Sequence, residues 1–107
     1  MASVREFLKA VADDLANRGA SSRDLLALQF EAERGNLKVL LGRERHPAHY
    51  PSLEDIFRMV STTCEQDGIT MRELERITFF DTEINLECSG HGGEAVYTYP
   101  IQASTVH

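Results

Sequence analysis

The chain has 107 residues, of which 42% are hydrophobic and 26% are charged, and it carries a net charge of −6. This length and composition predict one soluble globular domain with its own core, and no apolar stretch is long enough for a membrane-spanning helix. A signal peptide is not expected, because Glu6 and Lys9 interrupt the first apolar segment, and we therefore expect a cytoplasmic protein.

The charge is distributed unevenly along the chain. Residues 1–49 hold eight Lys or Arg and seven Asp or Glu, whereas residues 50–107 hold three and ten. The second half therefore predicts an acidic surface, which repels nucleic acid and attracts basic protein surfaces. An acidic surface that only keeps the protein soluble is the alternative.

The first element is an amphipathic helix, expected at about residues 3–18. Ser3 can cap its start, and Gly19 stands where a residue with positive φ would end it. Residues 21–26 are expected to start as a helical turn. A β-hairpin should follow, with strands at residues 27–33 and 37–42 and a turn at Gly35-Asn36. The next segment, residues 44–51, contains two prolines and is expected to be an exposed connection.

The same pattern then returns 49 residues later. Residues 52–79 align with residues 3–30 without a gap, and six of the 28 pairs are identical. The alignment predicts a second long helix at about residues 52–66, a stop at Gly68 and a short helix at about residues 70–76. We interpret the repeat as an internal duplication, although two unrelated capped helices could also align this well.

The C-terminal part reads as β-structure. Residues 77–88 are expected to form a strand, residues 89–93 a glycine-rich turn, and residues 94–101 a partner strand. Pro100 marks this last strand as an edge strand or as its end. The predicted fold class is α+β. Two helix–β-hairpin units, at about residues 3–43 and 52–101, form one antiparallel sheet with both helices on one face.

No catalytic motif is present, and the chain is expected to be neither an enzyme nor the carrier of a cofactor. Cys64 and Cys88 lie on different predicted elements and do not indicate a disulfide framework. A small protein-binding module, such as a regulator, an inhibitor or an assembly factor, is the favoured function. The partner would be another protein, and a homodimer is a further option.

The candidate partner-binding residues belong to the acidic C-terminal region. They combine four carboxylates with two tyrosines on the last strand, and tyrosines on an exposed edge strand are typical of protein interfaces. Ordinary strand residues that cover a helix are an equally good interpretation of the two tyrosines. The set is Asp81, Glu83, Glu87, Glu94, Tyr97 and Tyr99.

Two alternatives belong to other functional classes. A basic cluster followed by a helix–turn–helix-like segment could indicate a winged-helix regulator that binds nucleic acid, although Met71–Arg76, the helix that would read DNA, carries no net positive charge. The cluster is Arg34, Lys38, Arg43 and Arg45. A zinc site is the second alternative, because two pairs of donors have suitable spacing. These donors are His46, His49, Cys88 and His91, and exposed loop histidines are the simpler interpretation.

Overall fold

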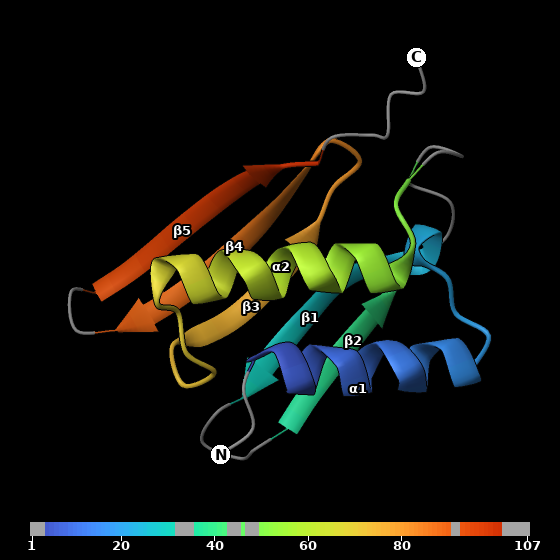
Figure 1. Ribbon diagram of the computed structural model, residues 1–107, viewed down its shortest axis with the longest axis horizontal. Helices are drawn as coiled ribbons and strands as arrows, with labels where there is room; N and C mark the ends of the chain where they lie inside the picture. Colours follow the sequence, from blue (N-terminus) through green and yellow to red (C-terminus); the bar gives the residue numbers. More distant parts are fainter. Residues whose placement is uncertain (1–3, 32–35, 43–45, 47–49, 91–92, 102–107) are drawn as a thin grey trace.

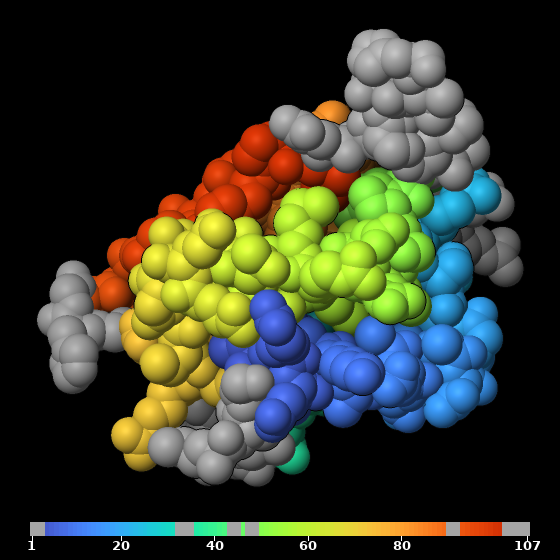
Figure 2. Space-filling model, in the orientation of Figure 1, coloured from blue at the N-terminus to red at the C-terminus, as the bar shows by residue number. Residues whose placement is uncertain are grey.

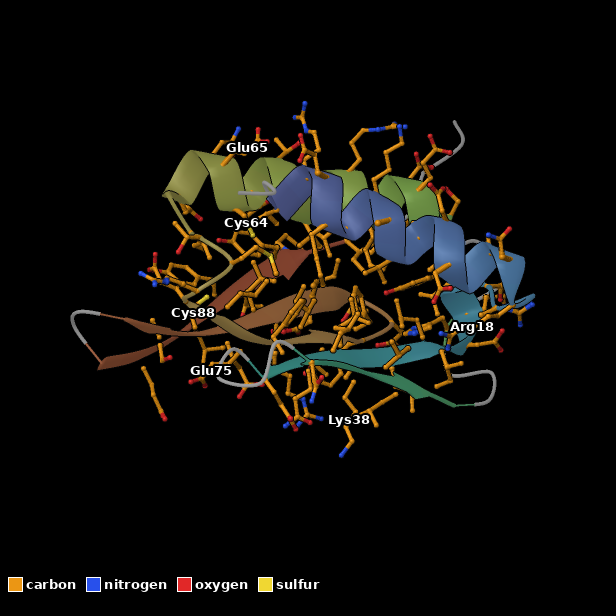
Figure 3. All side chains as sticks on the ribbon, turned by 90° about the horizontal axis from the view of Figure 1, so that it is seen from below. Arg18, Lys38, Cys64, Glu65, Glu75 and Cys88 are labelled. Carbon is orange, nitrogen blue, oxygen red and sulfur yellow. The ribbon has the colours of Figure 1, made fainter. Side chains whose placement is uncertain are left out.

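Two α-helices and a five-stranded antiparallel sheet make up the fold, which confirms the α+β class (Figure 1). This computed structural model describes residues 4–31, 36–42, 46, 50–90 and 93–101. The helices are α1 (Val4–Asn17) and α2 (Leu53–Asp67), and a short 3-10 helix, η1 (Ser22–Asp24), precedes the first strand. The strands are β1 (Leu25–Glu31), β2 (Asn36–Leu41), β3 (Leu74–Phe79), β4 (Glu83–Gly90) and β5 (Gly93–Pro100), in the spatial order β2-β1-β3-β4-β5. Figure 3 shows both helices on the same side of this sheet.

The helix ends follow the capping residues. At the start of α2, the Ser52 hydroxyl accepts a hydrogen bond from the Asp55 N–H at 3.2 Å. Gly68 ends α2 in the left-handed region at φ 69°, and Gly19 follows α1 at φ 78°. Both helices therefore lie within two residues of their predicted bounds.

The two units are joined in the sheet by β1 and β3. Leu28 pairs with Ile77, the residue 49 positions later that the sequence alignment sets against it. The two flanking pairs are Ala27 with Thr78 and Gln29 with Arg76. Each of these pairs has its equivalent in the other, because Ala27 aligns with Arg76 and Gln29 aligns with Thr78, 49 residues later. The units are thus related in the sheet by an approximate twofold axis at the Leu28–Ile77 pair.

An irregularity in the pairing also repeats at this spacing. The register of β1 against β2 shifts between Leu25 and Ala27, and the register of β3 against β4 shifts between Leu74 and Arg76. An extra residue at equivalent positions bends both hairpins alike. That the units arose by duplication stays a prediction, because geometry alone does not give ancestry.

Two predictions for the second unit are wrong. The short helix expected at residues 70–76 is instead a turn at residues 71–73, followed by β3, because Leu74 and Ile77 are buried in the sheet. Residues 77–88 are not one strand either. The chain turns after Phe79, the Phe80 N–H donates to the Glu83 carbonyl at 2.9 Å, and β4 begins there. The second hairpin is therefore β3–β4, and β5 has no counterpart among the described strands of the first unit.

The core lies between the helices and the sheet. Leu8 and Leu15 from α1, and Ile56 and Cys64 from α2, are almost fully buried against the central strands. Such burial of apolar side chains is the main stabilising contribution to a domain of this size.

The connection between the units also enters the buried part of the molecule. His46 is 4% exposed and Tyr50 is 8% exposed, and their rings stack with centroids 3.9 Å apart. The His46 Nε2 lies 2.9 Å from the Leu25 carbonyl oxygen, which ties the connection to the start of β1. The prediction of an exposed connection is therefore wrong at these residues. The turn expected at Gly35-Asn36 falls mostly outside the described residues, but Asn36 itself belongs to β2.

Candidate functional site: the open face and outer edge of the sheet

One face of the sheet is not covered by either helix. Side chains alternate along each strand, so the residues between the core positions point away from the helices. Figure 3 shows Lys38 and Glu75 on this far side. We call this uncovered side of the sheet the open face. Cross-strand partners lie on the same face, so two rows of side chains run across the open face from strand to strand. The first is Lys38, Gln29, Arg76, Glu87 and Val96, and the second is Leu40, Ala27, Thr78, Asn85 and Thr98.

The open face is acidic on the side of the second unit. Glu83 and Glu87 alternate with Asn85 on β4, and Glu94 stands opposite Ser89 on β5. The one described cation in this region of the open face is Arg76, whose Nε lies 3.9 Å from the Glu87 Oε2. That distance is too long for a direct hydrogen bond, and the buried Arg76 Nε has no hydrogen-bond partner among the described residues. The local excess of carboxylates is therefore only partly neutralised.

The structure does not bring the six predicted partner-binding residues into one cluster. Glu83, Glu87 and Glu94 belong to the open face, whereas Tyr97 and Tyr99 pair with the core residues Leu86 and Ile84 and point to the helix side. The tyrosine rings stack with centroids 6.4 Å apart. Asp81 lies in the β3–β4 turn, where its charge contributes to raising the pKa of the buried Tyr50, after burial itself.

Tyr99 is tied to the end of α2. Its hydroxyl donates a hydrogen bond to the Asp67 carboxylate. Burial, this hydrogen bond and the Asp67 charge together raise the pKa of Tyr99 above its ordinary value. Tyr99 therefore holds β5 against α2 rather than presenting a free hydroxyl, and sequence reasoning missed Asp67 because the two residues are far apart in the chain.

The outer edge of β5 is the most apolar exposed part of this region. Val96 is 60% exposed and Tyr97 is 37% exposed. No charged residue occurs from Ala95 to Pro100. Sequence reasoning identified the tyrosines but not Val96, although the lack of charge in this strand was a readable signal.

A groove between the outer surfaces of α1 and α2 was not predicted. It has a volume of about 570 Å³ and a floor that includes Ala12 and Phe57. Arg5, Lys9 and Arg58 line it together with acidic residues. Figure 2 shows the two helices side by side on this surface. Arg5 and Arg58 already form ion pairs, with Glu65 and Glu54 at 3.2 Å, so much of the charge in the groove is neutralised internally.

The chain matches no known protein-family model, and no curated protein or solved structure is similar enough to count as a relative.

The zinc alternative gains no support from the described donors. His46 is buried and its Nε2 lies within hydrogen-bond distance of a backbone carbonyl, which corrects the expectation of an exposed loop histidine. Cys88 is buried on β4, while His49 and His91 lie outside the described residues. Within the described ranges, no group of three or more His, Cys, Asp or Glu side chains has a geometry suited to a metal ion.

The nucleic-acid alternative loses its recognition helix. Met71–Arg76 is a turn and the beginning of β3, so it cannot enter a groove as a helix. Of the basic cluster, Lys38 lies exposed on β2, and the other three residues, Arg34, Arg43 and Arg45, lie outside the described residues.

The two cysteines are free and buried between the helices and the sheet (Figure 3). Burial, together with the nearby Cys88 thiol and acidic side chains, raises the pKa of Cys64 to about 12. Burial also raises the pKa of Cys88. Thiols in this state are protonated at neutral pH and are poor nucleophiles and metal ligands. No helix in the described part of the chain is long and apolar enough to cross a membrane.

Proposed function

We propose that this protein is a non-enzymatic binding module, acting as a regulator, an inhibitor or an assembly factor, and that its partner is a protein with a basic surface. The binding surface would be the open face at β4 and β5. The observation that carries the proposal is a row of carboxylates on a face that neither helix covers: Glu87 lies opposite the exposed Val96, Glu94 lies two residues before Val96 on β5, and Glu83 lies further along β4, opposite Pro100.

Physical chemistry favours this surface for a protein partner. Interfaces combine an apolar centre with a polar rim, and complementary charge accelerates association and selects the partner. Val96 supplies exposed apolar area, and the carboxylates supply the charged surroundings. The carboxylates are also spread along an open hairpin rather than enclosed in a cleft, which is a poor arrangement for acid–base catalysis.

The proposal is tested by reversing charge on the open face. The double variant Glu83→Lys with Glu87→Lys should lose the partner proteins that tagged wild-type protein captures from cells, with at least a tenfold lower yield. A matched control, Asp13→Lys with Glu65→Lys, makes the same change in net charge on the helix side and should retain them.

The outcome distinguishes a local surface from a general charge effect. Equal loss in both double variants would indicate that only net charge matters. Unchanged capture by the open-face variant would contradict the proposal.

A further inference from the structure

β5 is an edge strand along its whole length. In the described part of the chain it pairs with β4 and with no other strand. The Ile101 N–H donates to the Thr82 carbonyl at 2.9 Å. Because antiparallel pairing alternates, the backbone groups of Val96 and Thr98 therefore point outward, away from β4. Pro100 follows Val96 and Thr98 in this alternation, so its backbone nitrogen also points away from β4. The N–H that a proline lacks is therefore not missing from the pairing with β4.

The edge of β5 carries features that keep edge strands apart only at its ends, where Glu94 and Pro100 stand. Monomeric proteins usually protect such edges with Lys, with a bulge or with a Pro inside the strand. The opposite edge strand, β2, is shorter and carries Lys38 near its middle. β5 is eight residues long and pairs with β4 without a bulge, and its Pro stands only at its end.

We propose that two copies of this chain pair antiparallel through β5, so that their sheets form one continuous sheet. A register with Tyr97 opposite its own copy sets Val96 opposite Thr98 and Glu94 opposite Pro100. The outward N–H and C=O groups of Val96 and Thr98 then bond with each other across the interface. No like charges face each other in this register, and a closed twofold dimer is the commonest form of protein assembly.

Repulsion between the acidic halves does not prevent this pairing. The two Glu94 side chains would lie about six residues apart along the paired strands, or roughly 20 Å. The carboxylates on the two β4 strands would be separated by three strand spacings, about 14 Å, which exceeds the Debye length of about 8 Å at physiological salt.

A second copy also fits this edge better than a basic peptide would. The strand from Ala95 to Pro100 carries no charge, so it offers a cationic segment no direct partner. The nearest carboxylates on the open face belong to β4, one strand further in. An uncharged strand of the same length, presented by every other copy of the chain, matches the edge without such a mismatch.

Pairing through β5 is independent of the proposed function, since a dimer can form whether or not the open face binds another protein. It would, however, join two open faces into one surface, with the β4 carboxylates of both copies on either side of the dimer axis.

Sedimentation equilibrium at concentrations from about 5 to 500 μM tests the proposal. Wild-type protein should reach twice the chain mass of 12.0 kDa within this range. Val96→Pro removes an outward N–H without breaking a bond to β4, and should raise the dimer dissociation constant at least thirtyfold. Val96→Thr keeps the N–H and the β-branched shape and should remain dimeric.

Val96→Lys provides a second probe in case the proline variant fails to fold, since an exposed lysine on a strand edge opposes pairing without removing any backbone bond. Val96→Lys should likewise raise the dimer dissociation constant at least thirtyfold. A monomeric wild type throughout the range, or folded Val96→Pro and Val96→Lys variants that stay dimeric, would overturn the proposal.

Discussion

His46 is one of three polar residues that are buried in the described part of the chain, and it is the largest of them. Its ring stacks on Tyr50, and its Nε2 lies 2.9 Å from the Leu25 carbonyl oxygen. His46→Ala would open a cavity and remove this hydrogen bond, and we expect it to lower the free energy of unfolding by about 2 to 3 kcal/mol. Urea unfolding followed by circular dichroism measures this change.

The exposed residue Lys9 supplies the control, and Lys9→Ala should change the free energy of unfolding by less than about 0.5 kcal/mol. If His46→Ala were equally mild, the connection between the units would not be packed as the ring stacking indicates.

The buried thiols predict instability at high pH. The unfolded thiol of Cys64 loses its proton near its ordinary pKa of 9.0, whereas in the folded protein the pKa is raised to about 12. Above pH 9 the unfolded state therefore binds fewer protons, and stability should fall by up to about 1.4 kcal/mol per pH unit for this group. Cys88, Tyr50 and Tyr99 have raised pKa values and act in the same direction.

Urea unfolding at pH 8 and pH 10.5 measures the effect, and Cys64→Val should make the pH dependence less steep. Stability that is constant or rises over this interval would show that these groups are solvated in the folded protein. At pH 8, a thiol-reactive dye should label either cysteine only after unfolding.

At the scale of elements, the glycines that follow the helices should be sensitive to substitution for a conformational reason alone. Gly19 and Gly68 have positive φ, and a Cβ atom added at either position would meet no atom within 4 Å. Gly19→Ala and Gly68→Ala should therefore each destabilise the protein by about 1 kcal/mol through backbone strain rather than through steric clash.

Thermal unfolding of both variants measures the loss. The two values should agree closely, because the two glycines occupy equivalent places in the two units. A large loss at one position and none at the other would contradict that equivalence.

The helices could be predicted from sequence because their ends are set locally. Ser52 and Gly68 fix the ends of α2 through bonds to neighbouring residues. β3 could not be predicted in the same way. Thr70 and Glu73 resemble a helix start, and their side chains do form a hydrogen bond at 2.8 Å. The chain nevertheless enters the sheet, where β3 pairs with β1 and β4 and where Leu74 and Ile77 are buried. Tertiary pairing here overrides a local helix signal.

The candidate surface was predictable only in part for a similar reason. Alternation in the sequence separates Glu83 and Glu87 from the core, but it does not reveal that Tyr99 bonds to Asp67 at the end of α2. The exposure of Val96 depends on β5 being the last strand of the sheet, which only the pairing of all five strands determines.

At the scale of the whole molecule, the strand β5, which stands outside the twofold relation of the units, makes the two edges of the sheet unlike. Without β5, the twofold relation of the units would make β2 and β4 the two edge strands, in equivalent positions. The added strand β5 pairs with β4 and replaces that edge with an uncharged one. This one addition distinguishes the acidic side of the molecule from the other, and both the binding surface and the dimer interface that we propose lie there.

Amide hydrogen exchange in wild-type protein tests most directly whether β5 ends in solvent or in an interface. If two copies pair through this strand, the Val96 and Thr98 amides should become protected as the protein concentration rises, by at least tenfold, while the Tyr97 and Tyr99 amides bonded to β4 are protected at every concentration. Fast exchange of Val96 and Thr98 at all concentrations, beside protected Tyr97 and Tyr99, would contradict the interface.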